Sequence, residues 1–310
     1  MFIVTSGKKF VDIDALACVY AYSMLLKLME IRAIPVITAM PNQSVISRFR
    51  VQNLYTTQLP PDAISNDAQF VVMDVSDPAF FDSIVEIDKV TNVFDHHPGF
   101  EAFWKDRIGD GAVIEPIGAA ATLIFEEYVK NDAVEKMDRL TAELLYLAIV
   151  SNTLNFGASV TSGRDKNACM KLKTLFSFTD DLAKEYFEEV DKVVYTNTSL
   201  ALQNDTKIIP FGGGIVGIAQ LELWNSMDLQ NGKFEIIESF LSQLSADYAF
   251  LNLIEISKSR NTLVCANEQT AQWLVSFMGN LKRESATILR SSSLLLRKQI
   301  LSSIYDKFGR

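Results

Sequence analysis

The only two histidines of the sequence are adjacent, and they follow an aspartate. Asp95, His96 and His97 come directly after the apolar run Val90–Phe94. One imidazole can ligate a divalent cation such as Mn²⁺ while its second ring nitrogen donates to a carboxylate, which fixes the tautomer. The other can donate to a phosphate oxygen or protonate a leaving group. The pair could instead be structural, as helix-capping histidines.

Three further aspartates lie near the ends of apolar runs. Asp12 and Asp14 follow the run Met1–Thr5, and Asp74 lies near the end of the run Phe70–Val75. Carboxylate oxygens are the hard ligands that suit Mg²⁺ or Mn²⁺. Each acid also has a structural alternative, because an aspartate before a helix is commonly its N-cap and an aspartate after a strand commonly forms a turn.

Short apolar runs alternate with helical periods in the first part of the chain. We predict buried strands at residues 1–5, 34–38, 70–75 and 90–94. The intervening and following stretches have helical periodicity, which together with these strands indicates an α/β domain with a parallel sheet. Ligands of such sheets collect beyond the carboxyl ends of the strands, so we expect the acids and histidines to converge at that edge.

A polar stretch then separates this region from a second pattern of elements. We expect an N-terminal domain over residues 1–195, a linker at 196–206 and a smaller α+β domain over 207–310. Within the second domain, Gly212–Gly214 lies between two apolar runs, which is typical of a hairpin. This glycine cluster is not a phosphate loop, since it lacks the lysine, the serine or threonine and the following helix of that motif.

The composition excludes several classes of protein. The 310 residues are 48% hydrophobic and 22% charged, with a net charge of −9. Such acidity argues against nucleic-acid binding through a general basic surface, while leaving small anionic substrates open. No apolar run is long enough for a membrane span, and three cysteines fit no disulfide framework. We therefore expect a cytoplasmic, reduced protein that works on neither membranes nor nucleic acids.

The order and spacing of Asp12-x-Asp14, Asp74 and Asp95-His96-His97 resemble the DHH phosphoesterase superfamily. Further segments are similar to motifs of the manganese-dependent (family II) inorganic pyrophosphatases, namely 115–122, 142–156, 218–222 and 297–299. The resemblance spans essentially the whole chain. It implies an N-terminal parallel-sheet DHH domain, a smaller C-terminal α+β domain of the DHHA2 type and an active site in the cleft between them.

The same resemblance implies a set of site residues. Metal ligands for one or two Mn²⁺ or Mg²⁺ ions are expected at Asp12, Asp14, Asp74, His96 and Asn152. Catalytic roles fall on His97, Asp95 and Lys8, and substrate-binding roles on Lys207 and Arg297. We also expect a monomer or homodimer.

Three positions depart from the family pattern. Lys8 stands where the family has a metal-binding histidine, Asn152 where it has a metal-binding aspartate, and Leu296 where it has a phosphate-binding arginine. The Lys8 ammonium could stand in for one cation, or it could be a solvated loop lysine. Asn152 could ligate through its carbonyl oxygen, or be a remnant of the lost acid.

The two substrate-binding candidates have structural alternatives as well. Lys207 could be a hairpin-edge residue that blocks strand pairing. Arg297 could be a solvated charge on a terminal helix.

Two functions follow from this site. The first is a divalent-metal-dependent phosphohydrolase, pyrophosphatase-like, that cleaves a phosphoric anhydride or ester with metal-activated water. The second is a catalytically impaired homologue that binds a phosphorylated ligand or nucleotide as a sensor. Leu296 further suggests that the substrate need not be free pyrophosphate. A single-strand exonuclease is disfavoured, because the chain shows neither a basic surface nor an aromatic-rich platform.

Overall fold

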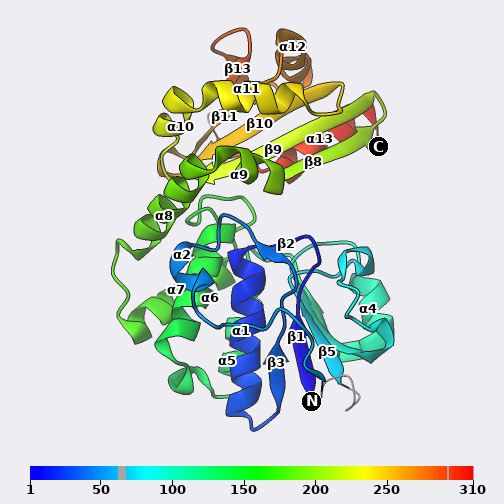
Figure 1. Cartoon of the computed structure of the whole chain (residues 1–310), viewed down its shortest axis with the longest axis vertical. Helices are drawn as coiled ribbons and strands as arrows, with labels where there is room; N and C mark the ends of the chain where they lie inside the picture. The colour runs from blue at the N-terminus through cyan, green and yellow to red at the C-terminus, as the bar shows by residue number, and fades with distance from the viewer. Residues whose placement is uncertain (62–67, 292, 310) are drawn as a thin grey trace. The chain divides into compact units, whose positions relative to one another are not determined.

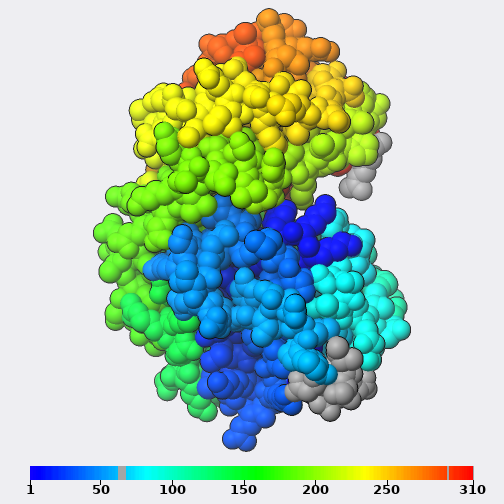
Figure 2. Space-filling model, viewed as in Figure 1, coloured from blue at the N-terminus to red at the C-terminus, as the bar shows by residue number. Residues whose placement is uncertain are grey.

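The computed structural model describes residues 1–61, 68–291 and 293–309. The chain divides into two compact units. The first comprises Met1–Phe156 and Val160–Ala183, and the second comprises Gly157–Ser159 and Lys184–Arg310. Each unit is built around its own sheet (Figure 1). The space-filling view shows that early segments (blue and cyan) and late segments (green) of the first unit share one face (Figure 2).

The first unit contains a five-stranded parallel sheet in the order β3-β1-β5-β6-β7. Its described elements, in chain order, are β1 (Phe2–Thr5), β2 (Phe10–Val11), α1 (Ile13–Leu28), β3 (Ala33–Pro35), β4 (Met40–Pro41), α2 (Ser47–Arg50), β5 (Gln69–Met73), β6 (Val90–Asp95), α4 (Glu101–Ile108), β7 (Ala112–Ile114), α5 (Ala120–Lys130), α6 (Arg139–Asn152) and α7 (Gly163–Phe176). Short 3-10 helices lie at Pro78–Phe80, Ile87–Lys89, Gly109–Gly111 and Val134–Lys136. The predicted parallel-sheet α/β domain is confirmed.

Apolar side chains on both faces explain why these strands form the centre of the unit. Helices α1, α5 and α6 pack together on one side and α4 covers the other (Figure 1). On the α4 side, Val72 and Val93 pack with the buried ring of Trp104, whose Nε1–H donates to the Ser76 carbonyl at 2.6 Å. Strands buried on both faces read as continuous apolar runs, and this is the pattern that made them predictable.

The second unit contains a six-stranded mixed sheet in the order β12-β13-β11-β10-β9-β8. Its elements are α8 (Leu182–Thr196, shared with the first unit), α9 (Thr198–Asn204), β8 (Thr206–Phe211), β9 (Gly214–Leu223), α10 (Met227–Gly232), α11 (Phe234–Ser242), β10 (Tyr248–Glu255), a 3-10 turn (Ile256–Lys258), β11 (Arg260–Cys265), α12 (Glu268–Phe277), β12 (Leu281–Arg283), β13 (Ile288–Ser291) and α13 (Arg297–Phe308). Strands β9 and β10 pair in parallel and the other pairs are antiparallel. This is the smaller α+β domain that the sequence predicted.

The glycine cluster forms the predicted hairpin turn between β8 and β9, where Phe211 pairs with Gly214. Gly212 lies so close to the end of α13 that an added Cβ would be 2.1 Å from the Phe308 carbonyl oxygen. Only a residue without a side chain permits this approach.

The stretch expected to be a linker, residues 196–206, includes regular secondary structure. It contains helix α9, which buries Leu202 and Ala201, and the division between the two units falls earlier, at Ala183 and Lys184. Polar residues on the exposed side of α9 hid its short apolar face in the sequence. The domain limits of residues 1–195 and 207–310 stay predictions.

No helix in the described ranges combines the length and apolarity that a bilayer span requires.

Asp191 attaches helix α8 to the end of β9 in the second unit. Its carboxylate accepts hydrogen bonds from the backbone N–H groups of Trp224 at 2.9 Å and Asn225 at 3.0 Å. Burial raises the pKa of Asp191 to about 6, although these two hydrogen bonds act in the opposite direction. The folded state therefore holds a proton that an unfolded chain releases near pH 4.

We predict that Asp191 makes stability depend on pH between about 4 and 6. Because its pKa is raised on folding, its contribution is complete below about pH 4 and is lost as the pH rises through about 6. Relative to Asp191→Asn, which stays neutral and keeps an acceptor oxygen, the wild type should lose about 1–2 kcal/mol between pH 4 and 7 after allowance for solvent screening. Denaturant unfolding across this range measures the difference.

The control is Asp306→Asn, which removes an exposed carboxylate from α13 in the same unit. This variant should keep the wild-type pH dependence. Parallel pH profiles for wild type and Asp191→Asn would contradict the prediction.

Candidate metal centre

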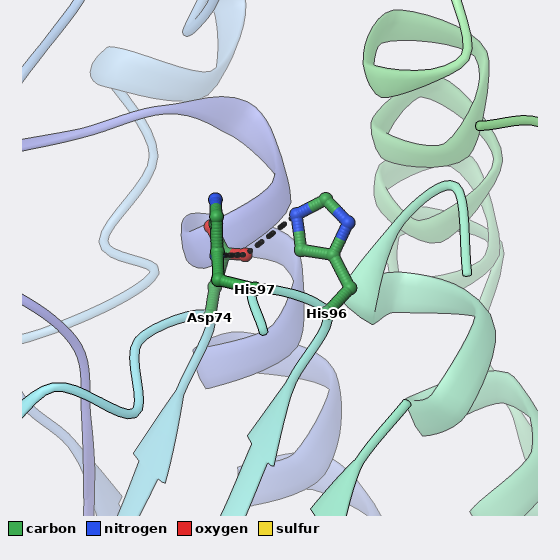
Figure 3. A group of neighbouring side chains, drawn as sticks. All are labelled: Asp74, His96 and His97. Carbon is green, nitrogen blue, oxygen red and sulfur yellow. Dashed lines mark ion pairs between the residues drawn. The ribbon is translucent and has the colours of Figure 1, made fainter. Parts of the chain in front are cut away.

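Asp74, His96 and His97 lie together beyond the carboxyl ends of β5 and β6 (Figure 3). One ligand atom from each residue lies within 4.8 Å of those from the other two. The two strands are neighbours in the parallel sheet, so the residues that follow them meet at one edge. The structure thus brings together three of the residues that the sequence singled out.

Asp74 has an unusual backbone and an unsatisfied side chain. It follows β5 with a φ of 57°, in the left-handed region, and its N–H donates to the Phe94 carbonyl at 2.7 Å. Its Oδ1 is buried and accepts no hydrogen bond from the described residues. The nearest ring nitrogens are His96 Nε2 at 3.4 Å and His97 Nδ1 at 4.0 Å. Burial, reinforced by the charge of Asp14, raises the pKa of Asp74 well above its ordinary value.

The tautomer of His96 follows from its second contact. Its Nδ1 lies 3.1 Å from the Ile117 carbonyl oxygen. A carbonyl can only accept, so Nδ1 carries the hydrogen and the neutral ring has its lone pair at Nε2. This lone pair faces Asp74 Oδ1, which is also an acceptor. Two facing acceptors are satisfied by a cation between them, so the donor set fits a divalent metal ion that takes one imidazole and one carboxylate.

His97 and Asp95 form a second, hydrogen-bonded pair. Asp95 is fully buried, and its Oδ1 lies 2.8 Å from His97 Nδ1 while accepting the backbone N–H groups of His96 at 2.7 Å and His97 at 3.1 Å. Burial opposes ionisation of Asp95, but the hydrogen bonds from His97 outweigh it and lower the pKa of Asp95. Desolvation by burial acts to lower the pKa of His97. The hydrogen bond to Asp95 and the charge of Asp74 outweigh this effect, so the pKa of His97 is raised.

The side chain of His97 is 63% exposed. Because Asp95 occupies Nδ1, the ring nitrogen that remains available is Nε2. An oriented imidazole with a raised pKa is suited to donate a hydrogen bond, or a proton, to an anionic oxygen.

Asp14 is held by donors of the protein itself. One carboxylate oxygen accepts from the Ala120 N–H at 2.9 Å and from Asn152 Nδ2 at 2.5 Å. The other accepts from the Ala121 N–H at 2.8 Å and from Cys18 Sγ at 3.6 Å. Burial raises the pKa of Asp14 to about 6, while the nearby His96 and the two backbone hydrogen bonds lower it. Four donors match the four lone-pair positions of a carboxylate, so in this arrangement Asp14 has no position left for a cation.

Asn152 ends helix α6 and turns its amide NH₂ group toward Asp14. An aspartate at position 152 would add a negative charge beside Asp14, whereas the Asn152 amide donates a hydrogen bond to it. Asn152 therefore acts here as a hydrogen-bond partner of Asp14, and its ligand role remains a prediction.

Lys8 precedes β2, and Asp12 lies between β2 and α1. Asp12 is the N-cap of α1 and accepts the Ala15 N–H at 2.9 Å, which is the structural alternative for this residue. Lys8 is exposed, and its backbone N–H donates to the Phe80 carbonyl at 2.9 Å. Among the described residues, neither Asp12 nor Asp14 joins the group of Asp74, His96 and His97. The roles proposed for Asp12, Asp14 and Lys8 stay predictions.

Comparisons with known proteins show a distant relationship over most of the chain. A probable manganese-dependent inorganic pyrophosphatase from Clostridium acetobutylicum is 22% identical over 96% of this chain and 94% of its own. The manganese-dependent inorganic pyrophosphatase from Methanothrix thermoacetophila is 24% identical over 82% of both chains. The chain is a distant homologue of the manganese-dependent (family II) inorganic pyrophosphatases.

Solved structures support the same fold for this pyrophosphatase homologue. The crystal structure of a putative family II inorganic pyrophosphatase from Methanococcus jannaschii covers all of both chains with a TM-score of 0.67 at 21% identity. An exopolyphosphatase-related protein from Bacteroides fragilis covers 98% of this chain and 90% of its own, with a TM-score of 0.53 at 12% identity. No family model matches the chain.

The two predicted substrate-binding cations of the homologue belong to its second unit. Arg297 begins α13, and its guanidinium donates to the side chain of Asp205 at 2.5 Å and to the Asp205 carbonyl at 2.8 Å. Its side chain is only 13% exposed. Lys207 is exposed on β8, which is an edge strand of the sheet. Both positions are compatible with the structural alternatives, and substrate binding by either residue stays a prediction.

One residue that contacts the site indirectly was absent from the predicted set. Asp165, at the start of α7, is fully buried and accepts hydrogen bonds from Gly118 and Thr122. The local signal was present, because Ser162 and Asp165 have the spacing of a capping box, and the structure shows that box at the N-terminus of α7. No local sequence pattern predicts the hydrogen bonds from Gly118 and Thr122 to Asp165, because these residues are far apart in the chain.

We predict that Asn152→Asp destabilises the metal-free homologue. The change removes the donor to Asp14 and places a second carboxylate against it, so the unfolding midpoint should fall by about 3–6 °C. Added Mn²⁺ should then raise the midpoint more than it does for the wild type, because a cation can bridge the two acids. Thermal unfolding with and without Mn²⁺ measures both effects.

Asn152→Ala is the matched control, since it loses the hydrogen bond without adding charge. It should be destabilised less than Asn152→Asp, and Mn²⁺ should not rescue it beyond the wild-type shift. An Asn152→Asp protein as stable as the wild type without metal would show that residue 152 does not neutralise Asp14.

Proposed function

We propose that this pyrophosphatase homologue is a divalent-metal-dependent phosphohydrolase that cleaves a phosphoric anhydride or ester with a metal-activated water. The observation that carries the proposal is the approach of His96 Nε2 to the buried Asp74 Oδ1, 3.4 Å apart, with His97 Nδ1 4.0 Å from the same oxygen. The relatives named above, which are described as manganese-dependent pyrophosphatases, support Mn²⁺ as the ion and a small phosphate compound as the substrate.

Asp74 and His96 are the residues that would hold the ion. When bound, a divalent ion supplies a hydroxide nucleophile near neutral pH and polarises a phosphoryl oxygen. His96 is ready for this role because Ile117 fixes its tautomer. Asp74 is ready because its buried Oδ1 accepts no hydrogen bond within the described part of the chain.

His97 is the residue that we assign to the phosphate. Asp95 holds the ring by Nδ1, so Nε2 donates to a phosphate oxygen or to the leaving group. Because the pKa of His97 is raised, a larger share of the rings carries the proton near neutral pH. Asp95 contributes by orienting the ring and by stabilising its charged form.

The proposal favours one ion over two. Asp14 is satisfied by four protein donors, and Asn152 is one of them. The exposed Lys8 ammonium would then add positive charge for an anionic substrate in place of a second ion. Cytoplasmic location and a monomeric or homodimeric state stay predictions alongside it.

The second candidate is a sensor that binds a phosphorylated ligand without turnover. It is favoured by the same saturation of Asp14 and by Arg297, whose guanidinium is already paired with Asp205. A phosphate would have to compete with that carboxylate for Arg297.

Mn²⁺ titration and phosphate release test the proposal directly. Calorimetry on the full chain should give about one ion per chain, and a panel of phosphate anhydrides and esters should contain at least one compound that is hydrolysed. His96→Ala should lose the ion, because a neutral imidazole ligand is removed. His97→Gln should keep the ion and lose about 10²–10⁴-fold in kcat, since only proton or hydrogen-bond donation is affected.

Absence of both bound Mn²⁺ and phosphate release would refute the phosphohydrolase. Bound phosphate compound with no turnover would favour the sensor.

A second prediction addresses the substituted positions. Lys8→His with Asn152→Asp restores the two residue types that the family resemblance expects there. If the wild type already hydrolyses phosphate compounds with one ion, the double variant should bind a second ion and hydrolyse pyrophosphate at least tenfold faster. Each single variant is a control, and neither alone should give the full increase. Pyrophosphatase activity that appears only in the double variant would show that the natural sequence has lost that reaction.

A further inference from the structure

A short segment that follows β7 and includes the start of α5 contacts His96 of the candidate site and also Asp14. We call it the 117–122 segment, comprising the turn at Ile117–Ala119 and the first residues of α5. The Ile117 carbonyl accepts from His96 Nδ1, and the N–H groups of Ala120 and Ala121 donate to Asp14. Three backbone groups of one segment therefore set the tautomer of His96 and the position of the Asp14 carboxylate.

This segment is attached to helix α7 by a single buried carboxylate. Asp165 Oδ2 accepts the Gly118 N–H at 3.1 Å, and Oδ1 accepts the Thr122 hydroxyl at 2.6 Å. Oδ2 also accepts the N–H of Ser162 at 2.7 Å and its hydroxyl at 2.8 Å. Asp165 has no exposed surface, so water cannot replace these donors without opening the structure.

The backbone at Gly118 packs so closely against Asp165 and Thr153 that a side chain would not fit there. A Cβ at this position would lie 2.6 Å from Asp165 Oδ2 and 2.6 Å from Thr153 Cγ2. The backbone therefore packs directly against the carboxylate, and a shift of Asp165 has to move the segment with it.

We propose that Asp165 is a positioning residue of the metal centre. It fixes the 117–122 segment, the Ile117 carbonyl in turn fixes the Nδ1–H tautomer of His96, and the Nε2 lone pair is thereby kept available for a cation. Asp165 makes no hydrogen bond to His96 itself. It contacts Gly118, Thr122 and Ser162, and it acts on His96 through the backbone of the 117–122 segment. The alternative is that Asp165 serves only as part of the capping box of α7.

The two roles use different bonds of the same side chain. Capping of α7 depends on Ser162, whereas positioning depends on Gly118 and Thr122. Ser162→Ala therefore removes the capping partner and leaves the bonds to the 117–122 segment. Thr122→Val removes one bond to the segment and leaves the capping box, at nearly constant volume. These two variants separate the roles that Asp165→Asn disturbs together.

The decisive measurement is the tautomer of His96 in the metal-free full chain. Because the chain has two histidines, a ¹H–¹⁵N spectrum of the rings, recorded in alkaline buffer, contains two ring systems. His97→Gln assigns them. We expect His96 to be the Nδ1–H tautomer in the wild type and in Ser162→Ala, and a mixture of tautomers in Asp165→Asn. An amide at residue 165 presents a donor where the carboxylate accepted, so the segment cannot keep all of its bonds.

Mn²⁺ affinity is the second readout. It should fall by about 10–100-fold in Asp165→Asn, as for other partners of metal-binding histidines. In Thr122→Val it should fall at least threefold, and in Ser162→Ala it should be unchanged even though that variant is less stable. The affinity readout rests on the proposed function, whereas the tautomer is read without metal. A protein that fails to hydrolyse phosphate compounds but loses the tautomer on Asp165→Asn would contradict only the function.

A folded Asp165→Asn protein with the wild-type tautomer and wild-type Mn²⁺ affinity would overturn the proposal. If Asp165→Asn does not fold, Thr122→Val decides in its place, and an unchanged tautomer and affinity there would overturn the proposal equally. Loss of the tautomer in Ser162→Ala to the same extent as in Asp165→Asn would show that the capping box alone is responsible.

Discussion

The candidate site depends on the approach of two groups, a buried carboxylate oxygen and an imidazole nitrogen, that repel each other unless a proton or cation lies between them. Asp74 Oδ1 and the Nε2 lone pair of His96 face each other in a largely buried setting, and a proton or cation between them removes the repulsion. The surrounding structure holds this contact from both sides. The left-handed backbone of Asp74 keeps its carboxylate at the end of β5, and the Ile117 carbonyl keeps the His96 ring from turning. A site with pre-oriented ligands binds an ion without first having to order them.

Four carboxylates near the site differ in the donors from which they accept hydrogen bonds. Asp12 accepts from the start of α1, and Asp14 from the start of α5 together with the Asn152 amide. Asp95 accepts from the histidine pair that follows it. Asp74 Oδ1 and Asp95 Oδ2 are both buried and accept no hydrogen bond among the described residues, but the bonds from His97 lower the pKa of Asp95, whereas burial raises the pKa of Asp74. The electrostatics therefore single out Asp74 as the acid that most needs a positive partner.

The sequence predicted the elements that local patterns determine. The central strands were visible as continuous apolar runs, the hairpin at Gly212 as a glycine cluster, and the convergence of Asp74 with the histidines as a consequence of parallel topology. Strand β7 was missed because Ala112–Ile114 is too short to form a pattern, and α9 because its apolar face is narrow. The sequence also did not predict that four protein donors would occupy the carboxylate oxygens of Asp14. Its partners on α5 and α6 are more than a hundred residues away in the chain, and no local spacing encodes which oxygen a distant N–H will reach.

The first unit consists of two stretches of chain, so its parts are synthesised at different times. Its sheet and every side chain of the Asp74–His96 pair are synthesised before residue 156, but α7, which carries Asp165, belongs to the later stretch Val160–Ala183. A nascent chain that ends with α6 contains Asp74 and His96 but lacks Asp165, which we propose to position His96. By that proposal the centre is complete only once α7 has been synthesised, although Asp74 and His96 are both present earlier.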